Sequence, residues 1–82
     1  MTWNDAVNYC ANLNEDGYSD WRLPNIDELK TLRGNAQSKL GDTGYFWSSS
    51  VRSDDNAWHV YFYYGVVSSD NKSLPISVRC VR

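Results

Sequence analysis

Few side chains in this sequence have the chemistry of a catalytic centre. The chain has one histidine, His59, and its longest run of serines is Ser48, Ser49 and Ser50. A serine becomes a nucleophile when a base is held beside its hydroxyl, and this spacing gives no sign of such a pair. A single histidine within a strand is usually a packing or surface residue. The sequence therefore predicts a protein that is not an enzyme.

Candidate metal ligands are also scarce. One histidine and the two cysteines, Cys10 and Cys80, lack the spacing of a zinc site. Carboxylate and amide oxygens cluster at residues 54–56 and 70–71, and calcium prefers such ligands. Calcium needs about six converging oxygens, however, and neither cluster has the pattern of an EF-hand loop. We therefore expect polar turns at both places, and neither a metal nor another cofactor.

The remaining candidate chemistry is aromatic and concerns non-covalent binding. In the strongest predicted strand His59, Tyr61 and Tyr63 alternate with apolar residues, which places them, with Tyr64, on an expected outward face. Aromatic rings stack on sugars and on protein side chains at small entropic cost. The polar residues before this strand that could add hydrogen bonds are Arg52, Asp54, Asp55 and Asn56. We predict that these two groups bind a ligand; alternatively, some tyrosines pack under residues 34–44.

Size and charge exclude several classes of protein. The 82 residues make one domain, 1–82, and a chain of this size buries about 60–65 % of its unfolded surface, so its core is marginal. The formal charge is −2 without a long run of like charge, so we expect no nucleic-acid partner. No apolar run approaches the roughly 20 residues that span a bilayer, and no signal peptide is recognisable.

The elements that would position these residues begin with an amphipathic helix at residues 2–13. Thr2 can cap this helix. Four apolar residues recur with the spacing of a single helical stripe: Trp3, Ala6, Val7 and Cys10. Cys10 is therefore expected to point into the interior.

A distinctive stretch, GYSDWRLPNIDEL at residues 17–29, follows this helix. Pro24 disfavours helical geometry at the residue before it, so the stretch begins as extended chain. We expect Trp21 and Leu23 to lie in the core. Arg22 is expected to brace a carboxylate or carbonyl groups, and the whole stretch is predicted to be a joint of the fold.

A second helix is predicted at residues 26–33. Asn25 and Glu28 have the spacing of a capping box at its start. Gly34 is expected to end it, because glycine is the usual residue just past a helix. Residues 34–44 are polar and contain further glycines, so they are predicted to be a loop.

The second half of the chain predicts an antiparallel sheet. Alternating apolar residues and turn residues between them place the strands at 45–49, 57–64, 66–69 and 76–81. In the last strand Ile76, Val78 and Cys80 share one face. The predicted fold class is therefore α+β, with two short helices packed on a small antiparallel sheet.

The two cysteines allow two interpretations. In a reducing compartment they would be small buried thiols, and in an oxidising compartment they would form one disulfide that closes almost the whole chain. Cys10 and Cys80 are both expected to face the interior, which favours the disulfide.

Several motifs together carry a resemblance to a known family. A Trp and a Cys on the first helix are followed, in order, by GYSDWRLPNIDEL, FWSSS, AWHVYFYYG and VRCVR. These motifs cover nearly the whole chain and resemble a bacterial family of unknown function that includes the C-terminal domain of Lcl-type collagen-like adhesins. The resemblance implies a C-type lectin-like fold, a disulfide between Cys10 and Cys80, and a secreted, periplasmic or cell-surface location.

The resemblance also implies non-covalent binding instead of catalysis. The predicted function is an extracellular recognition or adhesion module whose partner is a glycan or an extracellular protein. Members of the family are associated with sulfated glycosaminoglycans, but this chain is acidic overall and would need a local cluster of basic residues. The candidates for such a cluster are Arg22, Lys30, Arg33 and Lys39. The alternative is a structural or display domain without a fixed ligand, in which residues 50–72 vary.

Overall fold

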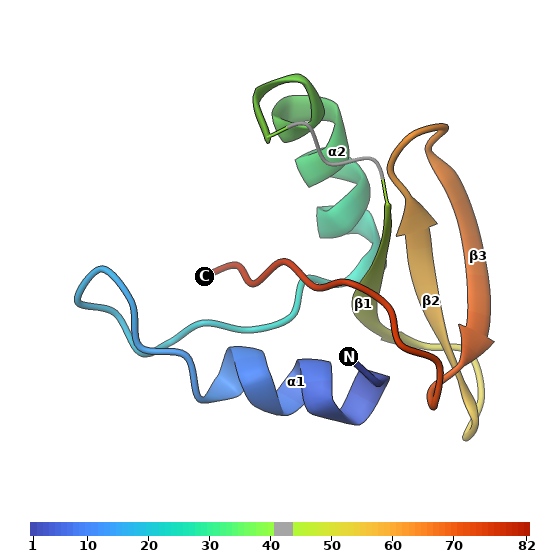
Figure 1. The fold of residues 1–82 in the computed structure, drawn as a ribbon, viewed down its shortest axis with the longest axis horizontal. Helices are drawn as coiled ribbons and strands as arrows, with labels where there is room; N and C mark the ends of the chain where they lie inside the picture. Colours follow the sequence, from blue (N-terminus) through green and yellow to red (C-terminus); the bar gives the residue numbers. More distant parts are fainter. Residues whose placement is uncertain (41–43) are drawn as a thin grey trace.

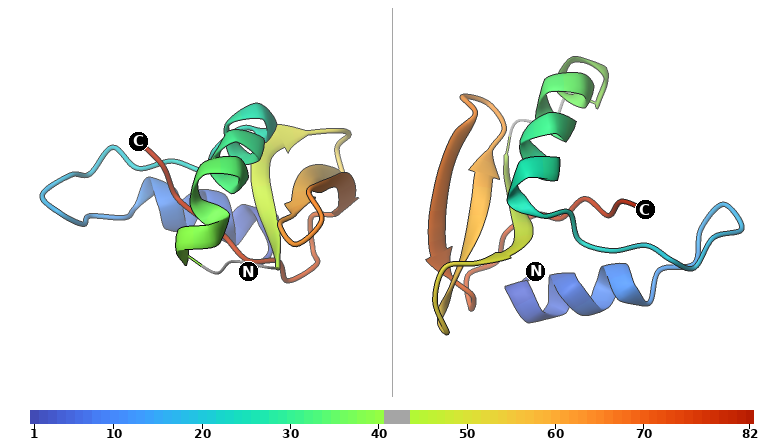
Figure 2. Two further views of the ribbon diagram at one scale, coloured as in Figure 1. Left: turned by 90° about the horizontal axis from the view of Figure 1, so that it is seen from above. Right: turned by 180° about the vertical axis from the view of Figure 1, so that it is seen from behind.

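The structure, a computed structural model, describes residues 1–40 and 44–82, and the side chains of residues 1–33 and 44–82. Its architecture is α+β as predicted, because two helices pack against a three-stranded antiparallel sheet in this part of the chain. The elements are α1 (Trp3–Ala11), α2 (Ile26–Leu40), β1 (Tyr45–Val51), β2 (Asn56–Tyr61) and β3 (Val66–Asn71), with the strand order β1-β2-β3. The C-terminal segment passes between the two helices (Figures 1 and 2).

The sheet buries side chains on both of its faces. Phe46 and Trp47 are neighbours in β1, so their side chains leave the strand on opposite faces. The α1-side core contains Ala6, Cys10, Leu23, Trp47 and Ala57. The α2-side core contains Leu29, Phe46, Val60 and Phe62. Each helix therefore packs against its own core, and the sheet lies between the two cores.

The helix α1 lies close to its predicted limits. Thr2 caps it as expected, since the backbone N–H of Asp5 donates to Thr2 Oγ1 at 3.3 Å. It ends at Ala11, a little before the predicted limit of residue 13. Ala6 and Cys10 are fully buried, which confirms the inward stripe.

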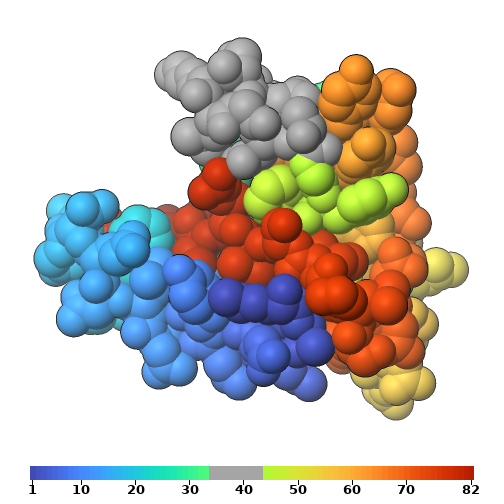
Figure 3. Space-filling view, in the orientation of Figure 1, coloured from blue at the N-terminus to red at the C-terminus, as the bar shows by residue number. Residues whose placement is uncertain are grey.

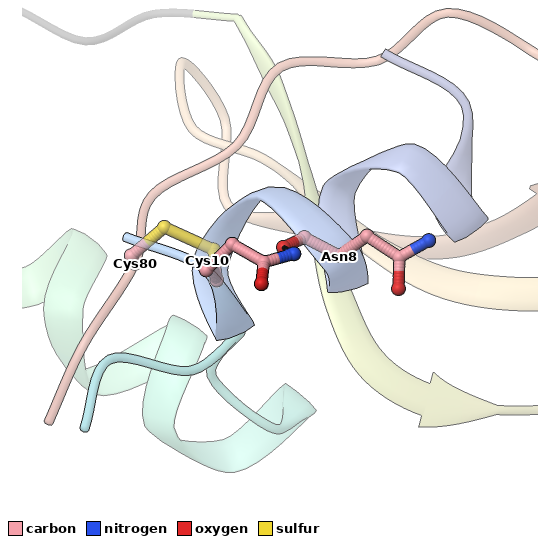
Figure 4. Close-up of a disulfide and its surroundings, with 4 residues drawn as sticks. Asn8, Cys10 and Cys80 are labelled. Carbon is pink, nitrogen blue, oxygen red and sulfur yellow. Dashed lines mark hydrogen bonds between the residues drawn. A yellow bond between two sulfur atoms is a disulfide. The ribbon is translucent and has the colours of Figure 1, made fainter. Parts of the chain in front are cut away.

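A disulfide joins Cys10 in the last turn of α1 to Cys80 in the C-terminal segment, as predicted. The two cysteines are 70 residues apart in the sequence, and Figure 4 shows the bond between these two elements. Closing a loop of this length stabilises a fold by roughly 4 kcal/mol in the chain-entropy account. For a domain with a marginal core, this is a large share of the total stability.

The predicted joint between the helices is largely confirmed. Leu23 is buried in the α1-side core, and Arg22 makes a two-pronged ion pair with Glu28 at 2.6 and 2.5 Å. The prediction for Trp21 is wrong, because its side chain is only partly buried and lies outside both cores. Its indole N–H donates to the carbonyl of Tyr18 at 3.2 Å, so Trp21 braces the preceding loop.

The capping box of α2 forms as predicted, but the predicted end of the helix is wrong. The N–H of Glu28 donates to Asn25 Oδ1 at 2.8 Å, and the N–H of Asn25 donates to Glu28 Oε1 at 2.9 Å. The helix continues through Gly34 to Leu40. A glycine inside a helix costs only about 1 kcal/mol, so Gly34 alone does not end it. Residues 41–43 of the predicted loop lie outside the described residues.

The predicted last strand at 76–81 is also wrong as a strand, although its inward face is right. The segment makes single bridges, Phe46 with Ser77 and Arg22 with Val81, and no continuous ladder. Three alternate residues of the segment still pack against the α1-side core: Ile76, Val78 and Cys80. The other strands agree with prediction within a few residues at each end.

Candidate functional site

The structure does not bring the predicted ligand-binding residues together. Tyr61 and Tyr63 lie where β2 enters its hairpin with β3. Four others lie in or beside the hairpin loop between β1 and β2, at the other end of β2: Arg52, Asp54, Asp55 and Asn56. Five residue steps of about 3.3 Å, or roughly 17 Å, separate the ends of β2. Apart from His59, the predicted ligand-binding residues therefore form two separate regions.

The first region is a group of tyrosines that we call the tyrosine surface: Tyr45, Tyr61, Tyr63 and Tyr64. Tyr45 and Tyr61 are directly opposite in β1 and β2, and their rings stack with centroids 4.4 Å apart. Tyr63 and Tyr64 meet edge to face at 4.6 Å, and the ring of Tyr61 contacts both. The exposed fractions of Tyr45, Tyr63 and Tyr64 are 49 %, 53 % and 70 %. In Figure 3 the start of β1 (yellow-green) lies beside the hairpin (orange).

The hairpin that carries the tyrosine surface is supported by α2. Phe62 is fully buried in the α2-side core and anchors the turn. Arg33 Nε donates to the carbonyl of Phe62 at 2.6 Å, and its Nη2 donates to that of Tyr63 at 3.4 Å. Gly65 has a φ of +73°, and a Cβ there would lie 2.9 Å from the Arg33 guanidinium. Glycine at this position thus allows both the turn and the close approach of Arg33.

His59 does not belong to this surface, and its predicted outward position is wrong. Only 1 % of its surface is exposed, because the rings of Tyr45 and Trp47 lie against it at centroid distances of 5.3 and 5.9 Å. Its Nε2 lies 2.8 Å from Asp70 Oδ2, and its Nδ1 is buried without a hydrogen-bond partner in the described structure. His59 therefore packs against the buried side of the Tyr45 ring and cannot reach a ligand.

Two of the three serines considered as nucleophiles, Ser48 and Ser50, have structural partners for their hydroxyls. Ser48 is buried, and its hydroxyl donates to the carbonyl of Trp58 at 2.7 Å. The hydroxyl of Ser50 accepts from the N–H of Ile26 at 3.0 Å, at the start of α2. Both hydroxyls thus hold the loop between β1 and β2 and the first turn of α2 in place.

The second region borders a polar cleft of about 350 Å³ between α1 and the ends of the strands. Its lining residues are Thr2, Asn4, Asp54, Asp55, Asn71, Lys72 and Ser73. The Lys72 ammonium lies over the Trp3 ring, 4.5 Å from its centroid. Across the described residues, no group of three or more His, Cys, Asp or Glu side chains could hold a metal ion.

The family model for the Lcl C-terminal domain matches residues 1–82. The chain belongs to this family. The predicted resemblance is thereby confirmed, and the chain is a domain of the collagen-like adhesin family. No curated protein matches the chain significantly.

Two further features of this Lcl C-terminal domain concern location. The Cys10–Cys80 disulfide and the adhesin family together indicate an extracellular or surface location, since disulfides persist in oxidising compartments. Among the described residues, none of the helices has the length and apolar character to span a membrane.

Three of the four basic side chains of the Lcl C-terminal domain that were considered for an anion site have other partners. Arg22 pairs with Glu28, Arg33 donates to the hairpin carbonyls, and Lys30 lies 3.5 Å from Asp27. The side chain of Lys39 lies outside the described residues. The hydrogen bonds from Arg22 and from the Asn25 N–H lower the pKa of Glu28 to about 2. Arg22 thus stabilises the joint between the helices, Lys30 lies beside an acidic residue of α2, and Arg33 stabilises the hairpin.

The remaining residues of the second region also have defined contacts. The Arg52 guanidinium lies over the Trp58 ring at 5.3 Å, and its Nη1 donates to Ser69 Oγ at 2.9 Å. Asn56 closes the loop, because its backbone N–H donates to the carbonyl of Ser53 at 3.3 Å.

Sequence reasoning missed Tyr45 as a member of the tyrosine surface. Tyr45 lies on β1, and its contact with Tyr61 depends on the register between the two strands. A tyrosine at the start of the preceding strand was a usable signal, because facing residues of a hairpin have side chains only about 5 Å apart. The strand limits had to be known first, and the loop between β1 and β2 left them uncertain.

Proposed function

We propose that this Lcl C-terminal domain is a non-catalytic recognition module of a secreted, periplasmic or surface-exposed bacterial protein. Its ligand is a glycan or an extracellular protein, and the tyrosine surface is the main contact. One observation carries the proposal: four tyrosine rings are in mutual contact, and Tyr45, Tyr63 and Tyr64 are 49 %, 53 % and 70 % exposed.

The mutual contacts of the rings favour binding. A ring that is already held by its neighbours loses little rotamer entropy when a ligand covers it. Its edge and face offer apolar area, and its hydroxyl offers a hydrogen bond. Because Arg33 and the buried Phe62 hold the hairpin, the ligand meets a preordered surface.

The second region would contact only an extended ligand. Roughly 17 Å of β2 separates Asp54, Asp55, Arg52 and Asn56 from the tyrosine surface. An oligosaccharide or a protein can span this distance, whereas a single sugar cannot. We therefore propose this second region as a secondary contact.

The C-type lectin-like fold is part of the same proposal. A disulfide from the first helix to the terminal segment supports it, as does the pairing of the chain ends. Met1 and Ile76 exchange two hydrogen bonds of 2.9 Å each, which brings the N-terminus beside the terminal segment.

A binding screen against a glycan array and a panel of matrix proteins tests the proposal. We expect the oxidised domain to bind at least one ligand, and Tyr63→Ala and Tyr45→Ala to weaken that binding by roughly tenfold, as aromatic hot spots do. Tyr9→Ala is the matched control, because Tyr9 is 45 % exposed on α1, outside the tyrosine surface. Equal binding by the wild type and both surface variants would contradict the proposal.

Buried residues in and directly after β2 weigh against the alternative of a display domain that varies over residues 50–72. That range contains Ala57, Val60 and Phe62, which are fully buried in the two cores. Free variation there would create cavities or overpacking, so only exposed positions could differ. A set of related sequences that varies at the buried positions as much as at the exposed ones would favour display.

A further inference from the structure

The outer edge of β3 is open. Among the described residues, β3 pairs with β2 alone, and β2 separates it from β1. Its first two residues, Val66 and Val67, are 52 % and 39 % exposed. The strand lies at the side of the molecule in Figure 1, away from both helices.

The pairing pattern shows which backbone groups of β3 point outward. The N–H of Phe62 donates to the carbonyl of Gly44, so alternate residues of β2 bond to β1. Tyr61 and His59 therefore direct their backbone groups toward β3, where their partners are Val66 and Ser68. The residues between these partners must direct their N–H and C=O groups to the open edge.

Val67 and Ser69 are thus the residues of β3 whose backbone donors and acceptors face solvent. Two bonds at the ends of the strand agree with this alternation. The N–H of Gly65 donates to the carbonyl of Tyr61 at 2.7 Å, and the N–H of Lys72 donates to that of Asp55 at 2.8 Å, both on the inner side.

Residues 66–69 of this edge lack the usual protection of an exposed strand. Natural edge strands carry lysine, proline, a bulge or an inward charge, which prevents pairing with other chains. β3 has the sequence VVSSDN and pairs with β2 in one continuous register. Its single charge, Asp70, points inward onto the buried His59 at 2.8 Å near the end of the strand, so residues 66–69 contain none of these protective features.

We propose that β3 binds an extended peptide segment of another protein by strand addition. Only an extended backbone can match outward N–H and C=O groups at alternate residues. The two ends of the edge define the peptide further. An apolar side chain fits beside Val66 and Val67. A basic one fits at the other end, where Asp54 and Asp55 are exposed near Asn71, because the ammonium of Lys72 in the same cleft is directed over the Trp3 ring.

A second copy of the chain fits this edge less well. The midpoint of β3 lies between Ser68 and Ser69, so two-fold antiparallel pairing can centre on either residue. Centred on Ser69 it places Val67 opposite the Asn71 of the other copy, and centred on Ser68 it places Val67 opposite Ser69 and Val66 opposite Asp70. The apolar end of each strand would then face a polar end, which is why a partner of different sequence is the proposed occupant.

This inference goes beyond the proposed function, because strand addition uses the backbone of β3 and not the tyrosine rings. A labelled peptide tests it by fluorescence anisotropy. The probe alternates valine and threonine, with leucine at one end and two lysines at the other, and is made in both chain directions. The key comparison probe carries N-methyl groups on the alternate residues that would pair with β3. Its matched control carries them on the other residues.

We expect one direction of the peptide to bind, and N-methylation of the pairing residues to weaken binding by roughly tenfold or more, because several hydrogen bonds are lost. N-methylation of the other residues is expected to leave binding within about twofold. Val67→Pro removes an outward N–H and is expected to weaken peptide binding as much as N-methylation of the pairing residues does. Val67→Thr keeps this N–H and is expected to bind the peptide like the wild type. The N-methylated probes keep the test valid even if the proline variant unfolds.

Three outcomes would overturn the inference. The first is equal binding of the two N-methylated probes. The second is no binding of either peptide direction up to about 1 mM, a concentration that half occupies a weak site with a Kd of about 1 mM. The third is a concentration-dependent dimer that the peptide does not dissociate, since a second copy would then occupy the edge.

Discussion

The two faces of the sheet are held by different means. On the α1 side, the nine-residue helix buries only Ala6 and Cys10 completely, and the disulfide fixes it to the terminal segment. Two indole N–H groups add hydrogen bonds there, from Trp3 to the carbonyl of Ser48 and from Trp47 to that of Met1. The α2 side has no covalent tie, and its core is wholly apolar.

This difference reflects how much apolar area each helix can bury. A fully buried leucine or phenylalanine contributes about 1.5–3 kcal/mol, whereas an alanine contributes far less. The α2-side core contains Leu29, Phe46, Val60 and Phe62, so packing alone can hold α2. The apolar stripe of α1 buries too little area for packing alone to hold this helix. The disulfide supplies the stabilisation that is missing.

The tyrosine surface depends on both sides. Tyr45 rests on the buried His59, which lies on the same face of the sheet as Trp47. The hairpin that carries Tyr63 is anchored from the other face by Phe62 and Arg33. Loosening either face should therefore affect the surface by a different route.

The largest expected effect is on the α1 side, from the double substitution Cys10→Ala with Cys80→Ala. We expect a loss of roughly 4 kcal/mol in the free energy of unfolding, because the unfolded chain regains its loop entropy. Urea denaturation measures this loss, and amide hydrogen exchange should show α1 losing protection before α2. The reduced wild type is the control and should match the double variant. An unchanged urea midpoint would show that packing alone holds α1.

The next effect is on the α2 side, from Leu29→Ala. Leu29 is fully buried, so we expect a loss of about 3 kcal/mol from the lost burial and the cavity that remains. Leu74→Ala is the matched control, because Leu74 is 42 % exposed and should change stability by less than about 0.5 kcal/mol. A Leu29→Ala variant as stable as the control would mean that α2 is not held by its core.

Much of this arrangement could be predicted from local sequence signals. The capping box of Asn25 and Glu28 needs only two side chains three residues apart, and it forms as expected. The inward stripe of α1 and the alternating face at Cys80 predicted a common interior for the two cysteines, and the disulfide confirms it.

Two of the wrong predictions, at His59 and in the last predicted strand, depend on distant parts of the chain. The alternation in β2 correctly predicted which residues share a face of the sheet. The face that contains His59 was predicted to be exposed to solvent, but at His59 the rings of Trp47 and Tyr45 from β1 cover it. Likewise, the extended segment near Ser77 has the pattern of a strand, but it meets its neighbours only at single bridges. Sequence periodicity gives the faces of an element and does not give what covers them.

The smallest effect concerns the joint between the two sides, where Arg22 contacts both. Its backbone pairs with Val81 of the terminal segment, and its guanidinium pairs with Glu28 of α2. The guanidinium and the N–H of Asn25 lower the pKa of Glu28 from 4.5 to about 2. The ionised carboxylate therefore stabilises the folded state above the unfolded pKa of about 4.5.

That stabilisation should disappear as the pH falls from about 4.5 towards 2, where Glu28 takes up a proton in the folded state as well. We expect the urea midpoint of the wild type to fall more steeply across this window than that of Glu28→Gln, which has no carboxylate to protonate. Arg22→Met should flatten the profile in the same way, because it removes the main cause of the low pKa. If both variants keep the wild-type slope, the ion pair with Arg22 does not lower the pKa of Glu28 in the folded state.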